Sequence, residues 1–152
     1  MALADGKVVQ IIGPTVDVEF PAEQLPDILT ALHIKNQSAG STIVVEVAQH
    51  LGNNVVRAVS MQSTDGLKRC DKAINTGQPI TVPVGRNTLG RLFNLLGEPI
   101  DLLGDLSTAP RLPIHRPAPN FEDQTSVSEV FETGIKVIDL LEPYAKGGKV
   151  GL

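Results

Sequence analysis

The chain has 152 residues, 41% of them hydrophobic, which is enough apolar surface for one ordinary core or two small ones. Its net charge is −4, 3% of its residues are aromatic and it has no tryptophan, so it lacks the basic surface and the stacking side chains that nucleic-acid binding uses. No apolar run approaches the roughly 20 residues that a membrane-spanning helix needs, and the first residues do not resemble a signal peptide. We expect a globular protein with no nucleic-acid partner and no direct membrane insertion.

Residues 6–82 predict short strands separated by turns. The expected strands are 7–12, 15–20, 31–35, 42–49 and 55–61. Turns are expected at Gly13-Pro14, at 36–41 and at 52–54, the last containing Gly52-Asn53-Asn54. Five or six strands at this spacing, without a convincing helix between them, favour a small closed barrel over a sandwich or an open sheet, because closure removes exposed strand edges.

Beyond residue 83 the pattern changes. Residues 87–96 predict a short helix, ended by Gly97-Glu98-Pro99, with four apolar residues on one side: Leu89, Leu92, Phe93 and Leu96. Four prolines between 110 and 119 then predict an extended strap laid across another domain.

The end of the chain predicts a helix, a turn and a strand. Apolar residues at near-helical spacing in 135–141 are followed by Pro143, which ends the helix, and Gly147-Gly148 predicts a turn. Residues 149–152 begin an apolar run that is short for a strand, so we expect the strand to continue beyond Leu152 and the chain to be a fragment.

We predict two domains, a barrel domain at 1–82 and an incomplete second domain at 83–152. The second region has too few elements to bury a core of its own, so we expect it to fold only with further strands. A cooperative melt and dispersed amide NMR signals from residues 83–152 alone would contradict this expectation.

Gly147-Gly148-Lys149 invites comparison with a phosphate-binding loop. That loop needs a glycine six residues before its lysine and a serine or threonine after it, so that backbone amides surround the phosphate and the hydroxyl reaches magnesium. Pro143 and Val150 occupy those positions. The sequence therefore favours a turn before a strand.

Acidic residues at short spacing are candidates for acid and base catalysis. The two pairs are Glu98 with Asp101, and Asp139 with Glu142. A catalytic pair needs environments that separate the two pKa values, and a turn or the polar side of a helix favours solvated faces or caps instead. Asp17 and Glu19 are expected on the solvent-facing side of a strand.

His33, His50 and His115 lie in three separate segments without the close spacing of metal ligands, so we expect ordinary surface or hydrogen-bonded histidines. Cys70 is the only cysteine, which excludes an intrachain disulfide and favours a reducing compartment. We expect its thiol to be small, buried or half-buried, and not catalytic.

Basic residues gather in the middle of the chain. They are Arg86, Arg91, Arg111 and Arg116, with Lys68-Arg69 as a smaller cluster. With 17 acidic residues available, we favour ion pairs, some of them across a subunit interface, over anion binding. No catalytic, cofactor-binding or metal-binding residue is assigned within the chain.

Several segments, in order, resemble the β subunits of the rotary F-type ATP synthases over the whole chain. They are Gly6-Lys7-Val8-Val9-Gln10-Ile11-Ile12-Gly13, Val16-Asp17-Val18-Glu19-Phe20, Leu89-Gly90-Arg91, Asn94-Leu95-Leu96-Gly97-Glu98-Pro99-Ile100-Asp101, Ile114-His115-Arg116-Pro117-Ala118-Pro119 and 132–152. Lys146-Gly147-Gly148-Lys149 favours β, since α subunits and export ATPases carry other turns there. The family commonly has glycine in the turn where this chain has Cys70, so the chain departs from the family pattern at this position.

The resemblance implies a mainly β fold: a six-stranded N-terminal barrel, followed by the truncated start of an α/β nucleotide-binding domain that ends before the phosphate loop. It implies the catalytic subunit of a proton-translocating ATP synthase, an enzyme that uses ATP, ADP and Mg²⁺ elsewhere in its sequence. The fragment itself would bind none of these and be inactive alone.

The implied partners are α subunits in an alternating hexameric ring, a central stalk γ subunit and, indirectly, a membrane proton channel. The implied location is the cytoplasmic face of a bacterial inner membrane, or the equivalent organellar membrane. The alternative is a free-standing, non-catalytic β-barrel interaction module, which requires residues 83–152 to fold independently. A barrel that binds single-stranded nucleic acid would need aromatic residues on a basic face.

Overall fold

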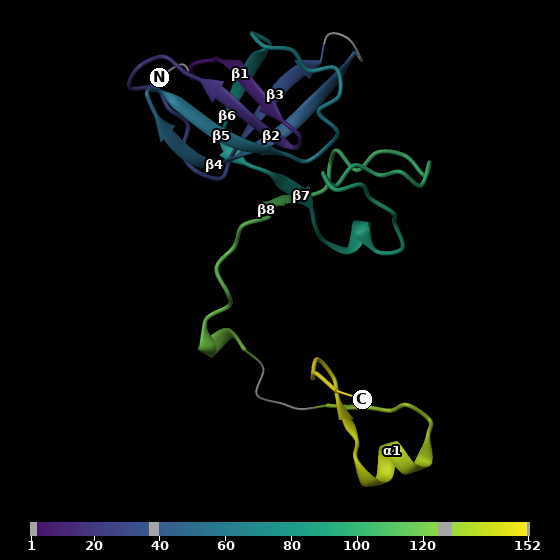
Figure 1. The fold of residues 1–152 in the computed structure, drawn as a ribbon. Helices are drawn as coiled ribbons and strands as arrows, with labels where there is room; N and C mark the ends of the chain where they lie inside the picture. The colour runs from purple at the N-terminus through teal and green to yellow at the C-terminus, as the bar shows by residue number, and fades with distance from the viewer. Residues whose placement is uncertain (1–2, 37–39, 125–128, 152) are drawn as a thin grey trace. The chain divides into compact units, whose positions relative to one another are not determined.

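The computed structural model describes residues 3–36, 40–124 and 129–151. Its first six strands are β1 (Gly6–Ile12), β2 (Thr15–Glu19), β3 (Thr30–Asn36), β4 (Ser41–Gly52), β5 (Val55–Ser60) and β6 (Lys72–Pro79). All neighbouring strands are antiparallel, and they close in the order β1-β2-β5-β4-β3-β6 (Figure 1). The predicted closed six-stranded barrel is confirmed.

The barrel interior is filled by aliphatic side chains that alternate with outward-facing residues along each strand. Val16 and Val18 in β2 and Val56 and Ala58 in β5 are fully buried, in register with one another across the two strands. Leu32 in β3 is among the largest of the fully buried side chains. The period-2 pattern in the sequence thus places one face of each strand in a common core.

Within the barrel, the predicted strands agree closely with the observed ones, with one omission. Strand β6 was not predicted because its sequence, Lys72–Pro79, contains two consecutive apolar residues followed by polar ones, Gly77 and Pro79. The turn between β4 and β5 is confirmed at Asn53 and Asn54, whose φ angles are 49° and 61°, a left-handed conformation that asparagine tolerates. The other predicted hairpin turn includes 37–39, which lie outside the described residues.

The pairing between β1 and β6 is the shortest in the barrel. Only Gly6↔Ala73 and Lys7↔Lys72 are in register there, and the ladder is extended by the Cys70 amide, which donates to the Val8 carbonyl at 2.7 Å. Cys70 is exposed and has a φ of 73°. The expectation of a buried or half-buried thiol is wrong, because this left-handed turn directs the side chain to solvent.

Replacing Cys70 by glycine is expected to raise the free energy of unfolding by about 0.5–1 kcal/mol, since glycine adopts a positive φ without a steric penalty. Chemical denaturation followed by circular dichroism measures the change. Cys70→Ala is the matched control: it removes the thiol but keeps a Cβ, so it should leave stability unchanged. An equal gain from alanine would show that the thiol, and not the backbone angle, is responsible.

After β6, the chain forms a two-stranded ribbon from β7 (Thr81–Pro83) and β8 (Arg111–Pro113), joined by a long loop. The loop contains one 3₁₀ turn, η1 (Arg86–Thr88), and no α-helix. The predicted helix at 87–96 is therefore wrong. Gly90 has a φ of 72°, and the Asn94 side chain accepts hydrogen bonds from the amides of Leu96 and Glu98, so local turns replace helical hydrogen bonds.

The described chain falls into two compact units, Met1–Arg116 and Pro117–Leu152. The second contains η2 (Phe121–Asp123), β9 (Val130–Phe131), α1 (Lys136–Leu141) and β10 (Tyr144–Ala145), with β9 and β10 antiparallel. The predicted helix before Pro143 is confirmed. The predicted domain boundary at 82/83 concerns independent folding and stays a prediction.

The expected strand at 149–152 is not found, as far as the structure describes this segment. Residues 149–151 have no regular secondary structure, and Leu152 lies outside the described residues. A strand forms when its backbone groups pair with a neighbour, and β9 and β10 already pair with each other.

In the described part of the chain, no helix is long and apolar enough to cross a bilayer.

Candidate functional site

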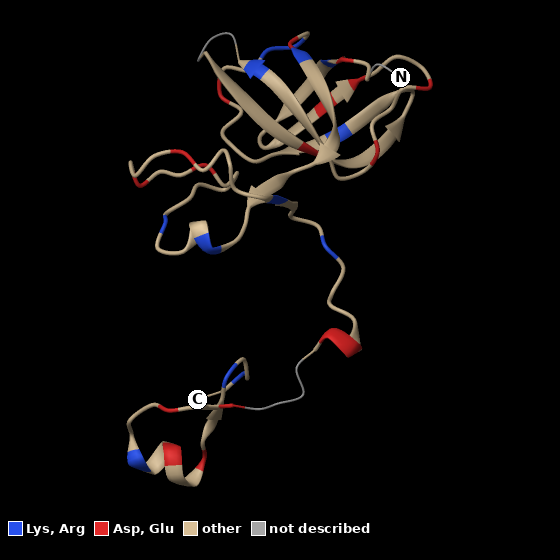
Figure 2. Ribbon diagram, turned by 180° about the vertical axis from the view of Figure 1, so that it is seen from behind, with Lys and Arg blue, Asp and Glu red and all other residues tan. Residues whose placement is uncertain are grey.

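Acidic and basic residues are interspersed over the barrel and its loops (Figure 2). Within the described ranges, no group of three or more histidine, cysteine, aspartate or glutamate side chains is arranged to hold a metal ion. The polar side chains instead form separate ion pairs and hydrogen-bonded turns. The sequence-predicted candidates are distributed among these.

One ion pair with a buried carboxylate lies on the barrel wall between β2 and β5. Arg57 donates from Nε to Asp17 Oδ1 at 2.8 Å and from Nη2 to Oδ2 at 2.9 Å. The Asp17 side chain is 6% exposed and that of Arg57 38%, and the pair raises the pKa of the arginine through the hydrogen bond and the attraction of the carboxylate. The expectation that Asp17 is solvated is wrong, although its strand face was predicted correctly; Glu19 is exposed as predicted.

Arg91 and Asp101 organise the long loop between β7 and β8. Arg91 Nε lies 2.5 Å from Asp101 Oδ2, and its Nη2 donates to Asp101 Oδ1 and to the Gly104 carbonyl. The amides of Leu92 and Leu103 also donate to this carboxylate. The guanidinium, with these two amides, holds the pKa of Asp101 well below its usual range.

The low pKa of Asp101 predicts how the loop responds to acid. A carboxylate with a depressed folded-state pKa contributes stability above its ordinary pKa of about 4, and the contribution is lost as pH falls through the folded value. The amide NMR shifts of Leu92 and Leu103 should therefore stay constant from pH 7 to pH 3. In Arg91→Ala the same shifts should titrate nearer pH 4, and a wild-type transition near pH 4 would contradict the ion pair.

The two carboxylate pairs do not form acid and base couples. Glu98 accepts a hydrogen bond from Asn94 Nδ2 at 2.6 Å, whereas Asp101 is paired with Arg91. Asp139 accepts from the Thr133 amide and hydroxyl and from the Gly134 amide, and the Thr133 hydroxyl is the main cause of its lowered pKa. Asp139 thus ties the preceding turn to the first turn of α1, while Glu142 is exposed.

The histidines also lie apart. His33 is exposed on β3, and His50 Nε2 lies 2.8 Å from the Pro26 carbonyl. His115 Nε2 lies 2.9 Å from Glu46 Oε2. Among the basic cluster, Arg91 confirms the expected ion pairing, whereas Arg111 donates to the carbonyl of Thr81 at 2.6 Å.

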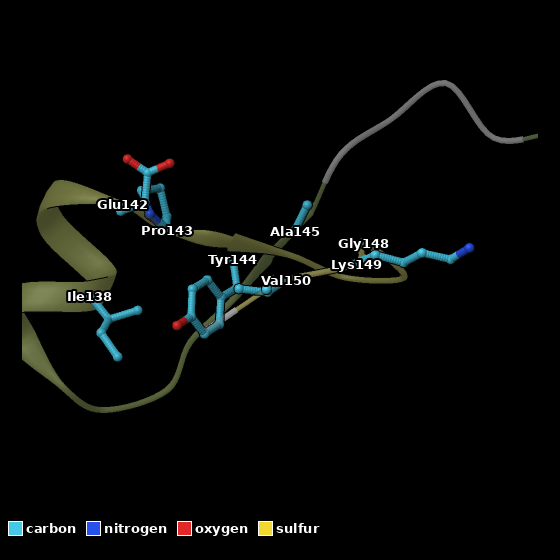
Figure 3. A pocket seen from close by; sticks show the side chains of 9 residues that line it. Ile138, Glu142, Pro143, Tyr144, Ala145, Gly148, Lys149 and Val150 are labelled. Carbon is cyan, nitrogen blue, oxygen red and sulfur yellow. The ribbon is translucent and has the colours of Figure 1, made fainter.

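Two of the depressions on the described surface include some of these groups. One of about 560 Å³ lies in the second unit, lined by Ile138, Glu142, Pro143, Tyr144, Ala145, Gly148, Lys149, Val150 and Gly151 (Figure 3). The Lys149 side chain points away from it, and the Gly148 amide donates to Ala145 at 3.0 Å in a turn with Gly147 at φ 76°. This geometry agrees with the predicted turn and does not fit a phosphate or magnesium site.

The other depression is a groove of about 750 Å³ on the outer face of the barrel. Strands β3, β4 and β6 line it together with the loop and β8, mostly through polar side chains that include His33, Glu98 and Arg111. A closed barrel has no free strand edge, so contacts with another protein must use such side-chain surfaces.

A closed antiparallel barrel of six short strands, with ion pairs on its outer wall, defines a small all-β domain. Residues 8–77 match the family described as ATP synthase alpha/beta family, beta-barrel domain. The match extends from β1 to β6, so the barrel of residues 8–77 is similar to the barrel domain of the ATP synthase alpha/beta family. That family description covers α and β subunits alike.

Sequence reasoning missed Asp17–Arg57 and Glu46–His115. A signal for the first existed, because Asp17 and Arg57 are each a single charge between apolar residues in a predicted strand. Their pairing depended on β2 lying beside β5, which follows from barrel closure and not from the local pattern. The second pair joins residues 69 positions apart.

Proposed function

We propose that the chain is part of the catalytic β subunit of an F-type ATP synthase and that its barrel serves ring assembly. The observation that carries the proposal is the family match across all six barrel strands. The Lys146-Gly147-Gly148-Lys149 turn, which resembles that of β subunits, supports β over α. Proton-coupled ATP synthesis would be the activity of the whole enzyme.

The proposed partners are α subunits on both sides of the barrel and, through the rest of the enzyme, a γ subunit and a membrane proton channel. A closed barrel favours this role because its backbone hydrogen bonds are satisfied internally, so recognition depends on outward side chains and stays specific. We propose a peripheral location on the cytoplasmic face of a bacterial membrane or its organellar equivalent.

ATP, ADP and Mg²⁺ are the proposed ligands of the full enzyme. Residues 146–150 do not fit them: the Gly148 amide is used within a turn, and Val150 stands where a magnesium-binding hydroxyl is needed. We propose that the nucleotide site of the full enzyme is formed by residues outside this 152-residue sequence.

Binding to α subunits tests the proposed function. Native mass spectrometry of the full chain mixed with α subunits from the same source should give a complex that contains both proteins. The chain alone should form complexes with itself in a smaller amount. A parallel titration with Mg·ATP should show no binding to the chain alone. Failure to bind α subunits, with the barrel folded by circular dichroism, would contradict the proposal.

A further inference from the structure

The sequence contains the dipeptide Asp-Gly twice, at Asp5-Gly6 and at Asp65-Gly66. In such a dipeptide the backbone nitrogen of the glycine can attack the side-chain carboxyl carbon of the aspartate, because glycine has no Cβ to obstruct the approach. The attack also needs a backbone that can rotate at the aspartate. The structure places the two dipeptides in opposite environments.

Asp65 and Gly66 are the central residues of an exposed turn between β5 and β6. The Leu67 amide donates to the Thr64 carbonyl at 3.1 Å, and Gly66 has a φ of 85°, which is typical of a type II turn. Among the described residues, none accepts a hydrogen bond from the Gly66 amide. The attacking nitrogen therefore has no hydrogen bond to break within the described part of the chain.

The Asp65 carboxylate is held close to its own backbone by one serine. Ser63 Oγ accepts a hydrogen bond from the Asp65 amide at 3.2 Å and donates to Asp65 Oδ2 at 2.7 Å. One contact opposes rotation of the turn, because Asn36 Nδ2 donates to the Asp65 carbonyl at 2.8 Å. Both reacting groups thus lie within one short, exposed turn.

The backbone at Asp5-Gly6 is fixed instead. Gly6 is buried in β1, in register with Ala73 of β6. A Cβ at Gly6 would lie 2.6 Å from Val18 Cγ1, so side chains pack directly against this part of the backbone. Attack by the Gly6 nitrogen on Asp5 therefore requires local opening of the barrel.

We propose that Asp65-Gly66 is a site of spontaneous modification, at which the aspartate is converted to isoaspartate without an enzyme. The Gly66 nitrogen bonds to Asp65 Cγ, and the hydroxyl of the protonated carboxyl group leaves as water together with the amide hydrogen. The product is a five-membered succinimide. Water then breaks one of its two C–N bonds: cleavage at Cγ restores aspartate, and cleavage at the backbone carbonyl carbon gives isoaspartate.

Isomerisation changes the contacts of this turn. The main chain then passes through Cβ and Cγ of residue 65, which adds one atom to the turn, and the former Asp65 carbonyl becomes a carboxylate. The hydrogen bond from Asn36, a residue that is 2% exposed, and the turn that positions Leu67 against the barrel core cannot both keep their geometry. The inference does not rest on the proposed function.

Enzymatic methylation of isoaspartyl carboxylates, followed by peptide mass spectrometry, locates the modification after prolonged incubation of the full chain in neutral buffer. Folded protein should contain at least about tenfold more isoaspartate at Asp65 than at Asp5, because the barrel must open before Asp5 reacts. In denaturing urea the two sites should react at similar rates. Equal modification of the two sites in folded protein, or the same preference in urea, would overturn the proposal.

Matched variants test the chemistry. Asp65→Glu keeps the charge but needs a six-membered ring, so it should abolish the modification in this turn, whereas Asp5→Glu should leave it unchanged. Asp65→Asn forms the same succinimide by losing ammonia and should accumulate isoaspartate faster than the wild type. An Asp65→Asn variant without isoaspartate would show that the turn prevents ring closure and would also overturn the proposal.

The NMR signals of asparagine side chains measure the effect on the turn. In isomerised protein separated by ion exchange, the Asn36 side-chain amide signals should shift, because their acceptor has become a carboxylate. The corresponding signals of Asn94, which donates to Glu98, are the internal reference and should stay constant. Unchanged Asn36 signals would contradict the inferred rearrangement.

Discussion

Replacing Leu32 by alanine is expected to lower the free energy of unfolding of the barrel by about 3 kcal/mol. Leu32 is 0% exposed in the core of the barrel, and its replacement by alanine forfeits the transfer free energy of three carbon atoms and leaves a cavity. Urea denaturation followed by circular dichroism measures the change, since the chain has no tryptophan for fluorescence.

Leu89→Ala is the matched control for this experiment. Leu89 is 76% exposed in the loop after η1, so its removal should change stability by less than about 0.5 kcal/mol. If Leu89 instead lay on the buried side of a helix, as the sequence pattern predicts, the two substitutions would have similar effects. Equal effects would therefore contradict the observed loop.

Replacing either Asp17 or Arg57 is expected to destabilise the barrel, but by different amounts. Arg57→Leu leaves a carboxylate that is 6% exposed without its partner, so it should lower the melting temperature by about 5–10 °C. Asp17→Leu should cost less, because the Arg57 side chain is 38% exposed and can turn towards water.

The double variant Asp17→Leu with Arg57→Leu distinguishes the ion pair from simple packing. Replacing both charges by apolar side chains leaves no unpaired charge, so the double variant should recover most of the loss. As a control, Lys72→Leu breaks the exposed pair with Asp5 and should change the melting temperature little. Additive losses in the double variant would contradict the account.

The barrel could be predicted from the sequence because its strands carry a strong local signal. The alternation of Val16 and Val18 with charged residues, and the Gly52-Asn53-Asn54 turn, each specify one conformation from neighbouring residues. Strand β6 lacks such a pattern and pairs with β1 and β3 through tertiary contacts that no local rule contains.

The wrong predictions have a common physical cause. The spacing of residues along the sequence does not reveal which side chains they contact in the fold. Leu89 and Leu92 are spaced for a helix, but Gly90 and the Asn94 side chain favour turns, and the Arg91–Asp101 pair stabilises them. Likewise, Asp17 faces outward as predicted but is covered by an arginine from another strand.

Isolation of the native protein with an antibody against residues 1–80 tests the central claim most directly, namely that this barrel belongs to an ATP synthase ring. Intact mass spectrometry of the recovered material should give a mass well above 16.2 kDa, with α subunits co-purifying. A protein of 16.2 kDa recovered without partners would contradict the account and favour a free-standing barrel module.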